Sequence, residues 1–218
     1  MKNLLSINAI NIYNPLDTKI ILKKSKQKIK FSFFKKSSVN LISIGRLTNQ
    51  KDHLTLLKAV KNIKDKINLK VVIIGKGKKK VEILNFIEKY KLSNCIKFIG
   101  YKDNPYPYLR MSDCLVLTSK YEGLPNVLLE AMYLKKFIIS SKCPTGPKEI
   151  LLNGKLGYLF KVSDFNALSN LILKYAKLKK INKSYINRTL NNGFKSLDRF
   201  NFEKNCRLYL ESINKILT

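Results

Sequence analysis

The chain has 218 residues, 45% of them hydrophobic, and 43 Lys plus Arg against 14 Asp plus Glu, which gives a formal net charge of +29. This length suits one good-sized domain with a real core, and no apolar run approaches the roughly 20 residues that span a bilayer. Because no signal-peptide pattern opens the chain either, we expect a cytoplasmic protein.

The excess of positive charge comes almost entirely from lysine. Only five of the basic residues are arginine, the residue whose planar fork reads base edges. Lysine is abundant together with isoleucine and asparagine, as AT-rich codons would produce, so a solvated lysine-rich surface is the simpler explanation. The alternative is a polyanion-binding module for nucleic acid or an anionic membrane. Since no stripe of interleaved aromatic and basic residues occurs, we expect no nucleic-acid partner; peripheral contact with the inner membrane leaflet is compatible with either interpretation.

Short apolar runs alternate with amphipathic stretches along most of the chain. Residues 1–38, with an Asn-Pro turn and a basic segment, form a lead-in and not a domain of their own. The runs that have the composition of buried strands are 39–45, 69–75, 95–100, 114–119, 136–141 and 157–160. Helical patterns occupy 52–65, 79–91, 125–134 and 164–178, with a short helical turn at 146–152 and a closing helix at 202–217.

This alternation predicts an α/β fold with a doubly wound, mostly parallel, Rossmann-like sheet. The sheet domain is expected over 39–180, and a lysine-rich helical segment follows over 181–218.

Cysteine and histidine argue against several kinds of site. The four cysteines contain no CxxC pair and match no zinc spacing. Cys95 and Cys114 lie in or beside predicted strands, where buried free thiols are expected. His53 is the single histidine, which excludes a metal site with two histidines. It stands at the start of a predicted helix, so we expect a packing or capping role for it and no metal.

Glycines and polar residues follow the predicted strands. In open α/β sheets, ligands bind beyond the carboxyl ends of the strands. Here those ends carry Gly45-Arg46, Gly75-Lys76-Gly77, Gly100-Tyr101, 121–123 and 141–149. Neither a dinucleotide-binding GxGxxG motif nor a Walker A motif is present. A phosphate at this edge would therefore be held by side-chain charge and by the start of a helix.

Arg46 and Lys51 are candidates for that charge. Arg46 follows the first strand, and Lys51 lies five residues later, where a helix starts. The two side chains can converge above the sheet and offer a fork and a point charge to a diphosphate. In so basic a chain, the pair can also arise by chance.

The stretch EGLPNVLLEAM (122–132) carries two of the few carboxylates. Pro125 suits the first turn of a helix, and Gly123 allows close approach of a ligand. The amides of residues 126–128 would then face an anion, helped by the helix dipole. Glu122 precedes the helix and Glu130 lies inside it, so the carboxylates could accept hydrogen bonds from sugar and ribose hydroxyls. The alternative is a glutamate favoured by the dipole together with an unrelated surface glutamate.

These motifs together resemble a known family. SIGRLTNQKDHLTLLKAV, VVIIGKG, IKFIGYKDN and SKYEGLPNVLLEAMYLKKFIISS are similar, in order over 39–178, to the donor-binding half of GT-B glycosyltransferases of family 4 (glycosyl transferases group 1). The E-x7-E spacing of Glu122 and Glu130 is the most specific part. INIYNPLD resembles the segment that joins the two halves of that family, and the helix at 202–217 resembles the one that packs back across them.

The resemblance implies roles for the residues at this edge. Arg46 and Lys51 would hold the diphosphate of a nucleoside-diphosphate sugar and stabilise charge on the leaving group. Glu130 would hold the ribose hydroxyls, and Glu122 would lie at the transferred sugar.

Backbone groups and glycines would complete the donor site. The resemblance places Gly123, Leu124 and the helix start at Asn126 beside the sugar and the phosphates. It places the base near Gly75, Gly77 and the strand end that includes Phe98 and Gly100.

The resemblance further implies a retaining transfer of a hexosyl group to a glycan or lipid-linked acceptor. It implies surface-polysaccharide synthesis as the setting and no requirement for a metal. Because Met1 falls near the joint, we expect the chain to lack the acceptor-binding half that precedes these motifs in the family. We therefore expect a donor-binding half that is incomplete without an N-terminal acceptor domain, as in a truncated gene product or in a split one whose N-terminal half is a separate partner.

Overall fold

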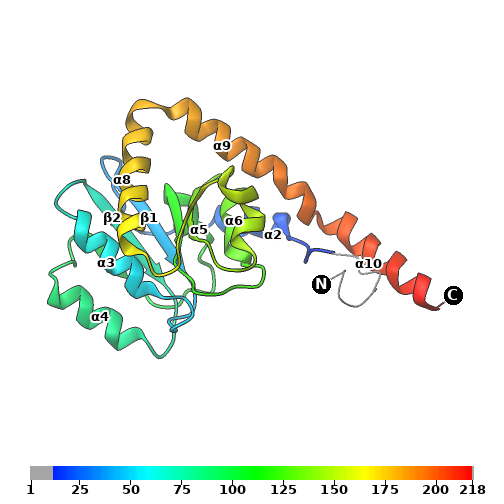
Figure 1. The fold of residues 1–218 in the computed structure, drawn as a ribbon, viewed down its shortest axis with the longest axis horizontal. Coiled ribbons are helices and arrows are strands. Elements are labelled where there is room, and N and C mark those ends of the chain that lie inside the picture. Colours follow the sequence, from blue (N-terminus) through cyan, green and yellow to red (C-terminus); the bar gives the residue numbers. More distant parts are fainter. Residues whose placement is uncertain (1–11, 218) are drawn as a thin grey trace.

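A single parallel sheet forms the centre of the molecule. The computed structural model describes residues 12–217, and within them six strands pair in the order β3-β2-β1-β4-β5-β6, every pair parallel. The strands are β1 (Val39–Ile44), β2 (Leu69–Ile74), β3 (Ile96–Phe98), β4 (Cys114–Leu117), β5 (Phe137–Ser141) and β6 (Tyr158–Phe160). Each lies inside its predicted range, and the predicted fold class is confirmed (Figure 1).

The strand order creates a switch point between β1 and β4. In β1, Leu41 lies opposite Val71 of β2 on one side and opposite Cys114 of β4 on the other. The chain adds β2 and β3 in one direction, then returns past β1 and adds β4, β5 and β6 in the other. The connections that leave β1 and β4 therefore separate at this point, which is where open α/β sheets bind ligands.

Helices cover both faces of the sheet (Figure 1). One face packs against α3 (His53–Ile63), α4 (Lys80–Lys89) and α8 (Phe165–Ile181). The other face packs against α2 (Thr18–Ser25), α5 (Tyr106–Met111), α6 (Asn126–Tyr133) and α7 (Pro147–Ile150), and the 3-10 helix η1 (Leu152–Gly154) follows α7.

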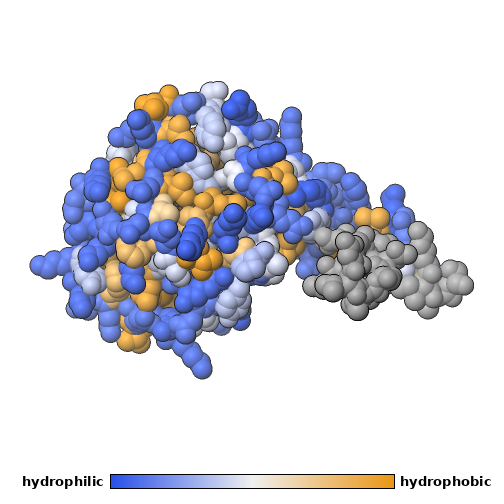
Figure 2. All heavy atoms as spheres, viewed as in Figure 1, coloured by the Kyte–Doolittle hydropathy of each residue, from blue (hydrophilic) through white to orange (hydrophobic). Residues whose placement is uncertain are grey.

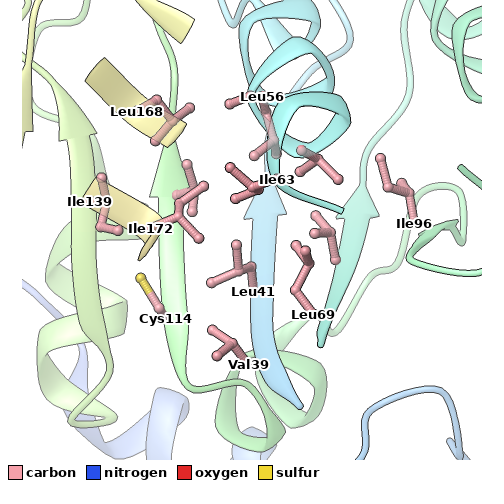
Figure 3. Close-up of a cluster of buried hydrophobic side chains, with 14 of the residues drawn as sticks. Val39, Leu41, Leu56, Ile63, Leu69, Ile96, Cys114, Ile139, Leu168 and Ile172 are labelled. Carbon is pink, nitrogen blue, oxygen red and sulfur yellow. The ribbon is translucent and has the colours of Figure 1, made fainter. Parts of the chain in front are cut away.

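Two hydrophobic cores result, one on each face. Val71 and Ile73 of β2 belong to the first core, which Figure 3 shows, and Val72 and Ile74 belong to the second. Successive side chains of a strand point to opposite faces. Both sides of these strands are covered, so the strands read as continuous apolar runs and not as alternating ones.

Asp17 and Asp164 cap helices on the two faces. At the start of α2, Asp17 accepts a hydrogen bond from the N–H of Ile20 at 2.9 Å. At the start of α8, Asp164 accepts one from the N–H of Ala167 at 2.8 Å. Each cap satisfies an amide that has no partner within its own helix.

The sequence patterns do not predict α2 or α5. α2 lies in the lead-in 1–38, and α5 is a six-residue helix that contains Pro107. Neither is long enough to show a helical repeat of apolar residues. They form because Ile21 and Leu109 are buried in the second core, so tertiary packing decides where local propensity is weak.

Three helical elements end the described part of the chain. They are α9 (Lys183–Ser196), the 3-10 helix η2 (Leu197–Phe200) and α10 (Phe202–Leu217). The first two pack on the sheet's hydrophobic cores, through Ile186 and through Leu197 and Phe200, and the last extends away from the sheet (Figure 1). The Nδ2 of Asn205 donates to the carbonyl of Tyr13 at 2.9 Å, and the hydroxyl of Tyr209 donates to the carbonyl of Ile12 at 3.3 Å. The lead-in and α10 therefore lie side by side.

The cysteines are free thiols. Cys114 is buried, as predicted, whereas Cys95 is only half-buried because it precedes β3 and is not part of it; that expectation was wrong.

Figure 2 shows one face of the surface, on which hydrophilic side chains are interspersed with scattered apolar ones. Across residues 12–217, no helix combines the length and the apolar character needed to cross a membrane.

Candidate functional site

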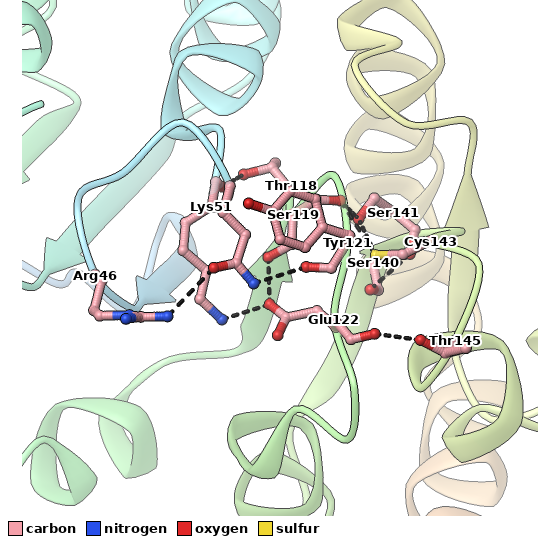
Figure 4. A network of polar contacts seen from close by, with 11 residues as sticks. Arg46, Lys51, Thr118, Ser119, Tyr121, Glu122, Ser140, Ser141, Cys143 and Thr145 are labelled. Atoms are coloured by element: carbon pink, nitrogen blue, oxygen red, sulfur yellow. Dashed lines mark hydrogen bonds and ion pairs between the residues drawn. The ribbon is translucent and has the colours of Figure 1, made fainter.

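Three loops meet beyond the carboxyl ends of β1, β4 and β5 (Figure 4). The loop after β1 carries Arg46 and Lys51, the loop after β4 carries Glu122, and the loop after β5 carries Thr145. The sequence separates these residues by up to about a hundred positions, and the switch point between β1 and β4 brings their loops together.

Arg46 is an exposed arginine that Gln50 ties to the loop after β4. The Nη2 of Arg46 donates to the Oε1 of Gln50 at 3.3 Å, and the Nε2 of Gln50 donates to the carbonyl of Tyr121 at 2.9 Å. The N–H of Lys120 in turn donates to the carbonyl of Gln50 at 2.7 Å. Gln50 thus joins the two loops and leaves most of the guanidinium's donors available.

Lys51 and Glu122 form an ion pair at the centre of the site (Figure 4). Their side chains are only 14% and 8% exposed. The hydroxyl of Ser119 also donates to the Oε1 of Glu122, at 2.6 Å. Thr118 holds the Lys51 backbone through a hydrogen bond to its carbonyl at 2.9 Å. Each charge is removed from water beside an opposite charge, and the Glu122 carboxylate has the further hydrogen bond from Ser119, which together compensate for desolvation.

The loop after β5 supports the Glu122 loop from the side. The hydroxyl of Thr145 donates to the carbonyl of Glu122, and the hydroxyl of Ser141 donates to the carbonyl of Ser119 at 2.5 Å. Gly146 has a φ of 79°, and a Cβ there would lie 2.1 Å from the carbonyl oxygen of Gly123. Only glycine permits this conformation and this close approach.

Glu130 lies in a separate polar pair. The hydroxyl of Tyr106, on α5, donates to its Oε1 at 3.2 Å. Burial raises the pKa of Glu130 above its ordinary value, although the bond from Tyr106 acts in the opposite direction. Burial and the nearby Glu130 raise the pKa of Tyr106 to about 12. The two glutamates of the E-x7-E spacing therefore have different environments, one ion-paired and one beside a phenol.

The start of α6 departs slightly from the prediction. The helix begins at Asn126 with Pro125 as its N-cap. The N–H of Leu128 donates to the carbonyl of Pro125 at 2.9 Å, so this amide, expected to face an anion, is already used. No hydrogen bond within residues 12–217 is made by the N–H groups of Gly123, Leu124 and Asn126. These amides remain as donors at the positive end of the helix dipole.

Comparison with known proteins decides the family. The model of the family described as glycosyl transferases group 1 matches residues 24–192 of the chain. The chain belongs to this family. An uncharacterized glycosyltransferase of Methanocaldococcus jannaschii is 33% identical over 199 residues, which cover 78% of this chain and 48% of the relative.

A second relative and a solved structure are also similar to the chain. The N-acetylgalactosamine-N,N'-diacetylbacillosaminyl-diphospho-undecaprenol 4-alpha-N-acetylgalactosaminyltransferase of Campylobacter jejuni is 26% identical over 91% of this chain and 52% of its own. The crystal structure of Anabaena HepE in complex with UDP and glucose has a TM-score of 0.81 at 19% identity, covering 94% of this chain and 56% of that one. The fold is that of one Rossmann-like half of a GT-B architecture, and the chain spans about half the length of these glycosyltransferases.

In this member of the family, the predicted base-binding glycines lie where two loops touch. A Cβ at Gly75 would lie 1.9 Å from the carbonyl oxygen of Gly45, and one at Gly77 would lie 2.4 Å from that of Leu47. The N–H of Gly75 donates to the carbonyl of Gly100 at 3.0 Å. Close packing of the loops after β1, β2 and β3 thus requires these glycines, with or without a ligand.

Phe98 and Gly100 lie at the carboxyl end of β3. Phe98 pairs with Ile73 in the sheet and is half-buried against the first core. Gly100 has a φ of 72° and no heavy atom within 4 Å of where a Cβ would lie. The space beyond the end of β3 is therefore open.

His53 is the first residue of α3 and is buried, which agrees with the predicted packing role. Its pKa is lowered to about 4, mainly by burial and to a smaller extent by the positive charge of Lys51. Its neighbour Asp52 accepts hydrogen bonds from Thr55 at 2.8 Å and from Ser163 at 2.9 Å. The imidazole is thus a neutral group beneath the Lys51 loop.

Four residues of this arrangement were not predicted: Gln50, Tyr106, Ser119 and Thr145. Each is a common polar residue whose importance depends on a partner distant in the sequence. Gln50 meets Tyr121, and Tyr106 meets Glu130. Ser119 could have been noticed, because it lies three residues before Glu122 at a strand end.

Proposed function

We propose that this chain is the donor-binding half of a retaining glycosyltransferase of family 4, and that it binds a nucleoside-diphosphate sugar at the switch point between β1 and β4. The observation that carries the proposal is the convergence of Arg46 and Lys51 with Glu122 at that point. A cation pair, a helix start and a carboxylate are the groups that a diphosphate linked to a sugar would need.

The diphosphate would be held from two sides. Arg46 offers its free guanidinium donors, and the ammonium of Lys51, next to Glu122, offers a second positive charge. The amides of Gly123 and Asn126 offer backbone donors at the positive end of α6. When the glycosidic bond breaks, negative charge grows on the diphosphate, and these fixed donors would stabilise it.

Glu122 and Glu130 would serve two different sets of hydroxyls. Glu122, in the loop before α6, would accept hydrogen bonds from the transferred sugar, beside the Gly123-Leu124 backbone. Thr145, whose hydroxyl donates to the carbonyl of Glu122, and Gly146 also line a hollow of about 390 Å³, together with Glu149 and Arg199. Glu130, inside α6 and held by Tyr106, would accept hydrogen bonds from the ribose.

The base would lie over the ends of β2 and β3, near Gly75, Gly77, Phe98 and Gly100. The open space at Gly100 supports this position. The crystal structure of the Anabaena neighbour is a complex with UDP and glucose, which makes uracil the first base to test.

We further propose that the hexosyl group passes, without a metal ion, to a glycan or lipid-linked acceptor on the cytoplasmic side of the membrane in surface-polysaccharide synthesis. The Campylobacter relative is named for transfer to a diphospho-undecaprenol-linked sugar. The acceptor would be held by an N-terminal half such as would complete a GT-B architecture, which makes that half a partner of this chain.

Calorimetry with UDP, GDP and their sugars, in the presence of EDTA, tests donor binding. We expect saturable binding of at least one nucleotide that Arg46→Ala weakens by about 1.5–3 kcal/mol, the value of a charged hydrogen bond. Arg207→Ala is the matched control, because Arg207 is exposed on α10, and it should leave the affinity unchanged. A folded sample that binds none of these nucleotides would contradict the proposal, as would equal losses in the two variants.

A further inference from the structure

The lead-in helix α2 carries a cationic face whose residues are not part of the proposed donor site. Residues 18–51 contain nine lysines and one arginine and no acidic residue. Lys19, Lys23 and Lys26 are exposed and repeat at intervals of four and three residues, which places them on one side of a helix. Lys26 continues the helical backbone as the C-cap. None of the three has an ion-pair partner within residues 12–217.

Exposed aliphatic side chains border this cationic face. Ile20 is 47% exposed and Leu22 is 42% exposed. Ile21 and Ser25, on the inner side of α2, are buried. At 100° per residue, Ile20 and Leu22 lie about 100° to either side of Ile21, so they flank the lysines. The outward surface of α2 is thus a row of ammonium groups between two apolar edges.

The rest of the protein holds α2 in a defined position. Asp17 caps its first turn, and the Nδ2 of Asn104, in the loop before α5, donates to the carbonyl of Lys24 at 3.0 Å. Asp17 also contributes to the raised pKa of Tyr106, the partner of Glu130. α2 packs on α5 and α6 (Figure 1). The cationic face is therefore fixed to the side of the molecule that contains the Tyr106–Glu130 pair.

We infer that the outward face of α2, formed by Lys19, Ile20, Leu22, Lys23 and Lys26, docks on an anionic lipid surface. Lysine ammonium groups would meet lipid phosphates, while their stems and the two aliphatic side chains would enter the headgroup boundary. A single-stranded nucleic acid would favour arginine and exposed aromatic rings for stacking, and this face has neither. Charge complementarity together with exposed aliphatic residues therefore favours lipid.

Asn104, which holds α2, lies in the loop that follows the carboxyl end of β3, so docking there would place this edge of the sheet near the membrane. An acceptor carried on a lipid would then meet the carboxyl edge of the sheet without leaving the bilayer surface. The binding of α2 to lipid does not depend on donor binding, so the two can fail separately.

Co-sedimentation of the full chain with vesicles of phosphatidylcholine, with and without phosphatidylglycerol, tests the inference. We expect binding only to the anionic vesicles, weakening with salt. The triple variant K19E/K23E/K26E should lose about 100-fold in partition, because each lysine near such a surface contributes about fivefold. K177E/K180E/K183E is the control, because it makes the same change in net charge. Its lysines are exposed on the α8–α9 segment, and α8 covers the opposite face of the sheet from α2. It should lose less than about fivefold.

A second variant separates lipid from nucleic acid. Ile20→Ser with Leu22→Ser should weaken vesicle binding by about tenfold and leave any binding to polyuridylate unchanged. UDP affinity and the melting temperature serve as folding controls for every variant. The inference is overturned by equal losses in the two lysine triples, by equal binding to neutral and anionic vesicles, or by vesicle binding that the serine pair leaves intact.

Discussion

The Lys51–Glu122 ion pair should oppose diphosphate binding and favour sugar recognition, and Glu122→Gln isolates the two effects. The amide keeps the size of the side chain but removes the charge that faces Lys51. Both side chains are largely buried, so an unpaired ammonium remains after the change. Loss of a charged hydrogen bond in such a place should lower the free energy of unfolding by about 1.5–3 kcal/mol.

The effect on nucleotide affinity has the opposite sign. In the native site, Glu122 repels any diphosphate that approaches Lys51. With an effective dielectric constant of about 40 and a separation of about 7 Å, one unit of negative charge contributes roughly 1 kcal/mol of repulsion. Glu122→Gln should therefore bind UDP about fivefold more tightly. It should also lose most of any preference for UDP-sugar over UDP, because the carboxylate that would accept the sugar hydroxyls is gone.

The assay combines urea unfolding with calorimetry of UDP and UDP-sugar binding. Glu82→Gln is the matched control, because Glu82 pairs with Lys79 at 2.6 Å on the surface, where the side chains are 37% and 41% exposed. Such a pair contributes about 0–1 kcal/mol. A double-mutant cycle with Lys51→Met should give a coupling free energy above about 1 kcal/mol for Glu122. If Glu122→Gln destabilises the chain no more than Glu82→Gln and leaves UDP affinity unchanged, the pair has no role in the site.

Two further predictions concern pH and turnover. The pKa of His53 is lowered from 6.5 to about 4, so the unfolded chain binds a proton near pH 6.5 that the folded chain takes up only near pH 4. The free energy of unfolding is therefore retained above pH 6.5 and falls by roughly 2–4 kcal/mol as the pH drops through this window. Urea unfolding of His53→Gln should show a shallower fall than that of the native chain. Equal slopes would mean that His53 does not titrate in this way. We also expect the 218-residue chain by itself to bind donor but to transfer sugar at a negligible rate, because transfer needs both substrates positioned in a water-poor cleft. Transfer from labelled donors to lipid extracts, with and without a separately expressed acceptor-binding half, measures this, and robust transfer by the chain alone would refute it.

Much of the fold could be predicted from local patterns. A strand buried on both faces needs consecutive apolar residues, so a run such as 69–75 predicts a strand from the sequence alone. The amphipathic repeat of α3 identifies it in the same way. α2 and α5 escaped prediction because their eight and six residues are too few for such a repeat, and both depend on burial in the second core.

The candidate site, like the fold, has features that the sequence predicts and others that depend on tertiary structure. The sequence by itself determined which residues stand at strand ends, and therefore that Arg46, Lys51 and Glu122 would lie along one edge of a parallel sheet. Only the tertiary structure decided that Lys51 pairs with Glu122, that Gln50 joins Arg46 to the Tyr121 backbone, and that Glu130 faces Tyr106. The physical reason is that strand formation depends on neighbours in the chain, whereas these contacts depend on which strands lie next to each other. That choice follows from packing both faces of the whole sheet, and no local pattern contains it.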